Sequence, residues 1–161
     1  MRRFVISLSF LIALLAAFGI ASAQNFGAAP QQFVTVLPLD PIHIPAGRPA
    51  TVDLHLRVAA NMHINAHAPH QDYLIPTTLT AAAAPGIMWG AIDYPTGVDR
   101  TFIFSPTEKF SVYAEDVTLR VHLIAQPGDH TATATLRYQA CDNRACYPPR
   151  NIPVKFIVTA K

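Results

Sequence analysis

The clearest pattern in the chain is a strict alternation of apolar and polar side chains over residues 50–58. Successive side chains of a β-strand point to opposite faces, so this alternation predicts a strand with one face in a core and the other in water. The same period returns in three later segments, which are residues 117–123, 131–138 and 152–158.

Shorter apolar segments predict further strands, and no segment after the N-terminal region keeps a helical period. The alanines of residues 81–84 are followed by Pro85, which cannot continue a helix. Residues 38–49 contain four prolines and are expected to be extended or turning. Short strands separated by Pro, Gly and Asp turns predict an all-β antiparallel β-sandwich. The weaker strands are expected at residues 33–37, 62–64, 87–94, 101–104 and 110–113.

The N-terminus has the features of a secretory signal peptide. Two arginines give it a positive start, a largely apolar stretch follows, and Ala21-Ser22-Ala23 is the small-residue pattern that precedes cleavage. The apolar stretch is near the lower length limit for a membrane-spanning helix, so an uncleaved anchor is the alternative. We expect export to the periplasm, an oxidising compartment in which a disulfide persists. The expected parts are a signal peptide at residues 1–23, a flexible leader at 24–32 and one domain at 33–161.

The balance of charge narrows the range of partners. The chain has 12 Lys and Arg against 10 Asp and Glu, and two of the basic residues lie in the predicted signal peptide. Removing residues 1–23 from the 161 leaves 138 residues with 10 charges of each sign, counting His as neutral. Without a basic stripe, neither nucleic acid nor an anionic membrane is expected as a partner.

Both cysteines lie in one stretch, Tyr-Gln-Ala-Cys-Asp-Asn-Arg-Ala-Cys-Tyr-Pro-Pro at residues 138–149. In a continuous strand Cys141 and Cys146 would lie about 17 Å apart, so a disulfide between them needs a turn, which Asp142 and Asn143 favour. Closing so short a loop contributes only about 2 kcal/mol. From spacing alone, a plain structural disulfide in an exported protein is the favoured interpretation.

The words Tyr-Gln-Ala-Cys and Cys-Tyr-Pro-Pro, separated by a short polar insert, resemble the redox-active segment of the N-terminal periplasmic domain of thiol:disulfide interchange protein DsbD. The insert of four residues is one shorter than in the best-known members of that family. Weaker matches follow in the same order and extend the resemblance over nearly all of the mature chain. They are Met62-His63-Ile64-Asn65-Ala66, Tyr73-Leu74-Ile75-Pro76-Thr77, Tyr94-Pro95 and Ser111-Val112-Tyr113.

The resemblance implies an immunoglobulin-like sandwich in which Cys141 and Cys146 cycle between dithiol and disulfide, with no cofactor. In the family this pair carries electrons from a thioredoxin-like domain to periplasmic thioredoxin-fold partners, for processes such as cytochrome c maturation. Family proteins also carry a multi-helix membrane electron channel and a C-terminal thioredoxin-like domain. These 161 residues contain neither, so a separately encoded membrane electron-transfer protein is among the expected partners.

In the family a mobile cap loop shields the sulfurs with an aromatic residue. The matching region is residues 98–110, where Phe102, Phe104 and Phe110 are the candidates. Phe104 is the preferred one, and a core position for all three is the alternative. Tyr138 and Tyr147 flank the cysteines in sequence, although Tyr138 lies on the apolar phase of its strand and fits a core position equally well.

The reactivity of the pair follows from its neighbours in sequence. Arg144 is the only nearby cation, and Asp142 opposes it. Prolines rather than a helix follow Cys146, so the thiol-activating effect of a helix N-terminus is missing. We therefore expect a weakly activated pair that depends on its partner.

Two other classes of function stay open. Met62, His63, His67 and His70 offer thioether and imidazole ligands that suit copper, although a solvated histidine-rich loop is the simpler interpretation and no metal is expected. A structural or adhesive sandwich with a static disulfide is the other rival, because sandwiches support many functions. Hydrolase and nucleotide-binding motifs such as Gly-x-Ser-x-Gly and Gly-rich phosphate loops are absent from the sequence.

Overall fold

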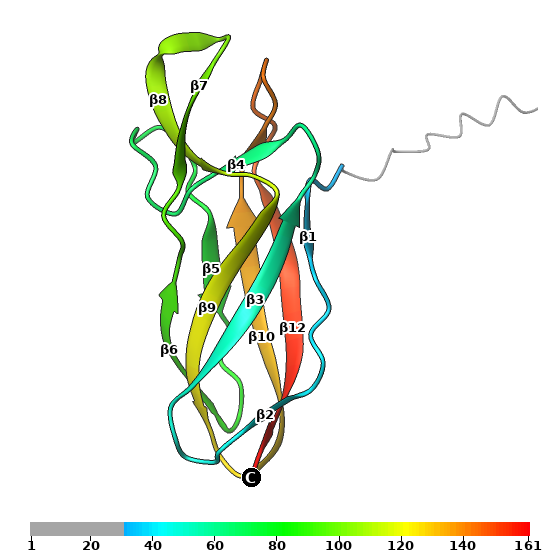
Figure 1. The fold of residues 1–161 in the computed structure, drawn as a ribbon. Coiled ribbons are helices and arrows are strands. Elements are labelled where there is room, and N and C mark those ends of the chain that lie inside the picture. The colour runs from blue at the N-terminus through cyan, green and yellow to red at the C-terminus, as the bar shows by residue number, and fades with distance from the viewer. Residues whose placement is uncertain (1–30) are drawn as a thin grey trace, which may run out of the picture. The chain divides into compact units, whose positions relative to one another are not determined.

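Strands dominate the part of the chain that this computed structural model describes, residues 31–161. That range contains no helix long and apolar enough to cross a membrane. The predicted signal peptide, residues 1–23, and the leader up to residue 30 lie outside the described residues. Within residues 31–161, twelve strands form three four-stranded sheets (Figure 1).

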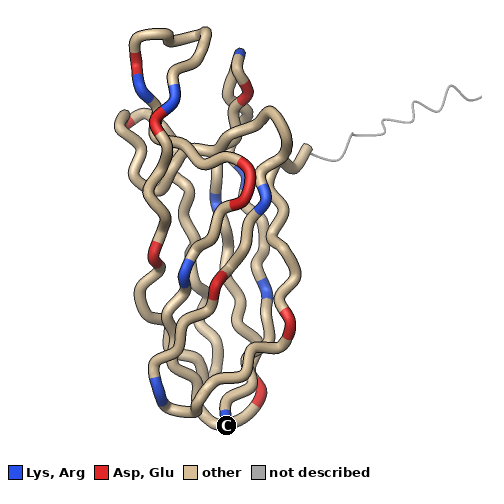
Figure 2. Tube along the Cα trace, viewed as in Figure 1, with Lys and Arg blue, Asp and Glu red and all other residues tan. Residues whose placement is uncertain are grey.

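The first sheet has the order β1 (Val34–Val36), β3 (Ala50–Val58), β9 (Asp116–Ala125) and β6 (Ile87–Asp93), with antiparallel neighbours throughout. Burial along β3 alternates residue by residue, which confirms the strand predicted for residues 50–58. The outward face carries paired opposite charges, such as Arg57 and Asp116 at 2.8 Å. Acidic and basic residues therefore intermingle along this face (Figure 2).

The second sheet has the order β2 (Ile42–Ile44), β12 (Arg150–Ala160), β10 (Gly128–Tyr138) and β5 (Thr78–Ala81). β2 runs parallel to β12, and the other neighbours are antiparallel. The β10–β12 pair stays in register from Gly128 opposite Ala160 to Tyr138 opposite Arg150. The segment that contains both cysteines connects the end of β10 to the start of β12.

The first two sheets face each other and enclose the core between them, with β3 and β9 in front of β10 and β12 in Figure 1. Trp89 of β6 reaches across to Phe156 of β12 with the ring edge-on at 6.0 Å. Each fully buried leucine side chain contributes about 1.5–3 kcal/mol. The predicted all-β, immunoglobulin-like sandwich is confirmed. The fully buried aliphatic residues of its core include Leu54, Leu56, Leu119, Leu136, Val121 and Val158.

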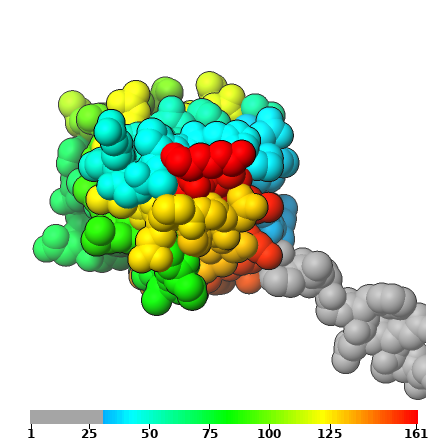
Figure 3. Space-filling model, turned by 90° about the horizontal axis from the view of Figure 1, so that it is seen from below, coloured from blue at the N-terminus to red at the C-terminus, as the bar shows by residue number. Residues whose placement is uncertain are grey.

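One end of the sandwich is closed by backbone hydrogen bonds around the C-terminus. The N–H of Lys161 donates to Ile44 O at 3.1 Å, and Lys161 O accepts from Ala46 N at 2.9 Å. Gly47, with φ of 67°, adopts the left-handed conformation and donates to Ala125 O at 2.8 Å. Seen from below, the C-terminal residues lie against neighbouring segments (Figure 3).

The third sheet lies at the opposite end, with the antiparallel order β11 (Ala140–Cys141), β4 (His63–Asn65), β8 (Ser105–Tyr113) and β7 (Val98–Phe102). Its strands β7 and β8 form a hairpin that projects beyond the sandwich in Figure 1. We call this hairpin, residues 98–113, the cap hairpin.

The strand predicted for residues 101–104 exists but with other bounds, because β7 covers Val98–Phe102 and the chain turns at Ile103 and Phe104. These apolar residues form the exposed tip of the cap hairpin, a place where turns are usually polar. Residues 110–113 belong to β8, which begins earlier than expected. The short strands β2, β5 and β11 were not predicted, since none is long enough to display an alternation.

Candidate functional site

Cys141 and Cys146 form a disulfide, and their Cα atoms are 3.9 Å apart. The two residues face each other in an antiparallel bridge between two backbone hydrogen bonds. On one side Tyr147 N donates to Ala140 O at 2.8 Å, and on the other Asp142 N donates to Ala145 O at 2.9 Å. The cysteines thus occupy a non-hydrogen-bonded pair, the type in which opposite residues approach most closely.

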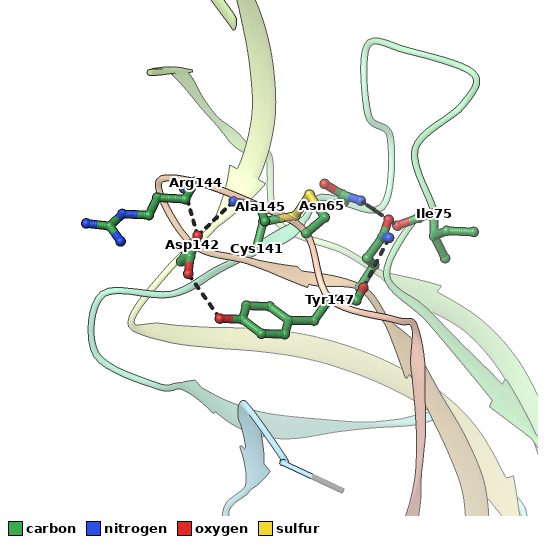
Figure 4. Close-up of a disulfide and its surroundings, with 9 residues drawn as sticks. Asn65, Ile75, Cys141, Asp142, Arg144, Ala145 and Tyr147 are labelled. Carbon is green, nitrogen blue, oxygen red and sulfur yellow. Dashed lines mark hydrogen bonds between the residues drawn. A yellow bond between two sulfur atoms is a disulfide. The ribbon is translucent and has the colours of Figure 1, made fainter. Parts of the chain in front are cut away.

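Asp142 holds the turn between the cysteines. Its Oδ1 accepts hydrogen bonds from the N–H groups of Arg144 at 2.7 Å and Ala145 at 2.8 Å, and its Oδ2 accepts from the Tyr147 hydroxyl at 3.0 Å (Figure 4). The backbone donors stabilise the carboxylate and lower the pKa of Asp142. The predicted role of Asp142 in a turn is confirmed. The Arg144 side chain, the one cation expected near the sulfurs, points away from the disulfide in Figure 4.

The two cysteines differ in exposure. Cys141 is only 1% exposed and lies on β11, directly opposite His63 of β4. Cys146 follows the turn and is exposed. A molecule that approaches from solvent therefore reaches Cys146 first.

A cavity of about 300 Å³ lies beside the disulfide. Both cysteines contribute to its lining, together with residues of two other segments. The cap hairpin supplies Phe104, Ser105, Glu108 and Phe110, and β4 with the loop after it supplies His63, Asn65, Tyr73 and Leu74.

The three phenylalanines considered for shielding form one cluster in the cap hairpin. The Phe104 ring lies 5.4 Å from that of Phe102 and 5.5 Å from that of Phe110. Phe110 is buried and Phe102 is half-buried, whereas Phe104 is 45% exposed and also lines the cavity. Phe104 thus lines the cavity beside the disulfide and is also in contact with solvent, and its shielding role stays a prediction.

Polar contacts hold the cap hairpin against the loop that follows β4. These contacts join residues 70, 71 and 73 of the loop to both strands of the hairpin. They are His70 Nε2 to Asp99 Oδ1 at 2.7 Å, Gln71 Nε2 to Lys109 O at 2.9 Å and the Tyr73 hydroxyl to Glu108 Oε2 at 3.4 Å.

Tyr138 and Tyr147, which flank the cysteines in sequence, do not line the cavity beside the disulfide. Tyr138 is fully buried in the core, where its hydroxyl accepts from Phe33 N at 3.2 Å. Tyr147 is half-buried beneath the turn, with its ring 4.6 Å from that of Phe33 and its hydroxyl on Asp142. Tyr138 therefore has the contacts of a core residue, and Tyr147 supports the hairpin that carries the disulfide.

His63 and Asn65 were not predicted as neighbours of the disulfide. His63 is buried and its ring stacks on Phe102 of the cap hairpin at 4.0 Å. Burial lowers the pKa of His63 to about 4, and the negative charge of Asp142 opposes this only in part. Asn65 Nδ2 donates to Ile75 O at 2.9 Å and so holds the loop after β4. The match at residues 62–66 pointed to this segment, but strand register is not visible in a sequence.

The histidines considered as copper ligands have separate partners. His67 stacks on Tyr94 at 3.6 Å, His70 pairs with Asp99, and His63 stacks on Phe102. Within residues 31–161 there is no group of three or more His, Cys, Asp or Glu side chains that could hold a metal ion.

Comparison with known proteins identifies the family. The family model for the N-terminal part of thiol:disulfide interchange protein DsbD matches residues 31–156. The chain is similar to the reduced N-terminal domain of DsbD from Neisseria meningitidis, with 17% identity, a TM-score of 0.47, and coverage of 69% of this chain and 79% of that one. It also resembles AggA, the major subunit of Escherichia coli aggregative adherence fimbriae type I, with 8% identity, a TM-score of 0.35, and coverage of 80% and 93%. No curated protein matches the sequence. The chain belongs to the family of DsbD N-terminal domains.

Proposed function

We propose that this protein is a thiol–disulfide exchange module that passes electrons to or from thioredoxin-fold partners through a reversible Cys141–Cys146 disulfide. The observation that carries the proposal is a bridge with one exposed cysteine, Cys146, beside a cavity under an aromatic cap hairpin. Membership of the DsbD N-terminal family supports the same chemistry.

The position of the bridge favours exchange over a structural role. Its cysteines are only five residues apart, so the loop-closure gain is about 2 kcal/mol. Backbone hydrogen bonds and the Asp142 carboxylate already hold the same turn. A disulfide that joined distant strands of the sandwich would stabilise the fold more.

The difference in exposure between the two cysteines supports the following order of events. A thiolate of a reduced dithiol partner attacks the Cys146 sulfur, the Cys141–Cys146 bond breaks, and its electron pair leaves with the Cys141 sulfur. The second thiol of the partner then attacks the mixed disulfide, which releases Cys146 and leaves the partner oxidised. Two electrons and two protons pass to this protein in total, and the reverse sequence reduces a partner disulfide.

The proposed setting is the periplasm, reached through cleavage of a signal peptide at residues 1–23. Periplasmic thioredoxin-fold proteins are the proposed partners, and a separately encoded membrane electron-transfer protein is a further proposed partner. The cap hairpin, with Phe104 over the cavity, is proposed to keep small oxidants and thiols from the sulfurs between encounters.

The reduction potential of the Cys141–Cys146 pair tests the proposal. Purified protein is equilibrated in graded thiol buffers and alkylated, and mass spectrometry then gives the fraction that was reduced. Exchange requires a value of roughly −180 to −270 mV, the range of known exchange proteins. A value below about −300 mV would identify an inert structural bridge and reject the proposal.

A further inference from the structure

His63 is placed directly beside the buried half of the disulfide. It faces Cys141 across the β4–β11 pairing, so the two side chains project from the same face of the sheet. Both residues line the same cavity. Of the residues that line this cavity, His63 is the one side chain that becomes cationic on protonation.

The environment keeps the imidazole neutral while the bridge is closed. The ring is buried, and its pKa is lowered to about 4 because burial disfavours the charged form. Phe102 covers one ring face at 4.0 Å. No hydrogen bond from the His63 ring is found among residues 31–161, so its edge nitrogens are available for a new partner.

Opening the disulfide places a negative charge on the Cys141 sulfur, beside His63. The sulfur of Cys141 leaves as a thiolate from a residue that is 1% exposed, and a buried anion is costly without a counter-charge or a hydrogen bond. The Arg144 side chain points away from the disulfide in Figure 4, so the cation nearest in sequence does not supply this counter-charge.

We propose that His63 stabilises the departing Cys141 thiolate, first by an N–H hydrogen bond and then as an imidazolium that takes up a proton from solvent. The imidazolium then passes this proton to the Cys141 sulfur, and it replaces the proton that the partner thiol released to solvent when it formed the attacking thiolate, so the product is a dithiol. This inference rests on the proposed function, in which Cys146 is attacked and Cys141 leaves. It makes His63 a proton-handling residue of the exchange.

Other titratable groups line the two cavities that His63 borders, and they contribute to any pH dependence. Asp142 is the negative group that acts on it in the closed state. A second cavity, next to the cap hairpin and the turn after β3, also has His63 in its wall. The remaining groups around the two cavities are Tyr73, Glu108, Arg100 and Glu115.

The decisive experiment compares the titration of His63 by NMR in oxidised protein and in protein fully reduced with a phosphine. In the reduced protein the His63 ring signals are expected to show a second inflection at the pKa of the Cys141 thiol, which the oxidised protein lacks, because the thiolate then accepts a hydrogen bond from the ring. Ring signals without this second inflection in the reduced protein would overturn the inference. A phosphine opens even a very stable bridge, so this result is independent of the reduction potential that tests the proposed function.

Kinetics supply a second test. His63→Phe retains an aromatic ring to stack on Phe102, and it is expected to slow reduction by dithiothreitol about tenfold to a hundredfold, as loss of one hydrogen bond to a charged group does. His67→Phe is the matched control, since His67 also stacks on an aromatic ring but does not line the disulfide cavity, and it should change the rate less than about twofold. Equal rates for the wild type and His63→Phe would reject the role.

Discussion

The two ends of this domain are built in opposite ways. The end around the C-terminus is closed by backbone hydrogen bonds that join Lys161, Ile44 and Ala46. The other end carries the third sheet, the cap hairpin and a cavity beside the disulfide. The buried polar residues of the described range, His63, Asn65, Thr77 and Ser111, lie in this third sheet or next to it. The aliphatic core therefore lies in the sandwich, and the proposed chemistry lies at the cavity end.

This division has a physical reason. A core of aliphatic side chains in register gives cooperative stability but offers no reactive group. Buried polar groups cost free energy unless they are hydrogen-bonded, as Thr77 is to Asn65 O at 2.6 Å. A protein carries such groups where they position something, and here His63 and Asn65 line the same cavity as Cys141.

The largest effect is expected when the sandwich core is damaged. Phe156→Ala removes a ring that is 3% exposed and should lower the free energy of unfolding by about 3–5 kcal/mol. Urea denaturation measures this. Ile157→Ala, on the same strand but with a 46% exposed side chain, is the control and should cost about 1 kcal/mol or less. A changed reduction potential in folded Phe156→Ala would contradict the division between the two ends.

The cysteines should show the reverse pattern, with total loss of exchange and a small cost in stability. Replacing either one by Ser should end exchange while reducing the free energy of unfolding by about 2 kcal/mol, the loop-closure term. With a thioredoxin-fold partner that lacks its resolving cysteine and whose remaining thiol is activated as a mixed disulfide with thionitrobenzoate, Cys141→Ser should trap a mixed disulfide through exposed Cys146, with thionitrobenzoate as the leaving group. Cys146→Ser should trap at least about tenfold less, because a buried thiol is poorly accessible. If Cys141→Ser alone prevented folding, the bridge would be a structural one.

The contrast between the sandwich and the cavity end also explains which features of this protein its sequence predicts. The long strands of the sandwich repeat one period, so the alternation in residues 50–58 marks β3 without any knowledge of its neighbours. The turn at Asp142 was predictable for a similar reason, because its carboxylate bonds to its own backbone two and three residues on. Local chemistry determines both features.

The cavity end was predicted only through the family resemblance, and incompletely. The placement of His63 opposite Cys141 depends on the register of two very short strands that are far apart in sequence. Packing of the whole domain sets such a register. The turn at Ile103 and Phe104 was missed because apolar residues at an exposed tip resemble a strand, and Ile103 is 84% exposed.

Substitution of two phenylalanines of the cap hairpin distinguishes a role in shielding the disulfide from a role in packing. Phe104→Ala should raise the rate of reduction by a small thiol several-fold and change stability by only about 1 kcal/mol, because the ring is partly exposed over the cavity. Phe110→Ala removes a buried ring and should cost about 3 kcal/mol or more. Stopped-flow reduction and urea denaturation measure the two quantities. Equal reduction rates for the wild type and Phe104→Ala would remove Phe104 from the shield.

The smallest effect on stability is expected at Asp142, which holds the turn that carries the disulfide. Hydrogen bonds from the N–H groups of Arg144 and Ala145 lower its pKa in the folded protein below the ordinary value of 3.8. A group with a lowered folded pKa stabilises the fold above its unfolded pKa, and that contribution disappears as the pH falls through the folded value. Asp142→Asn keeps an acceptor for both N–H groups but loses the charge, so its melting temperature should fall by only a few degrees at pH 7. The difference from the wild type should shrink below about pH 4 and vanish in stronger acid. A difference that stays constant from pH 7 to pH 2 would mean that the shape of the Asp142 side chain, and not its charge, holds the turn that carries the disulfide.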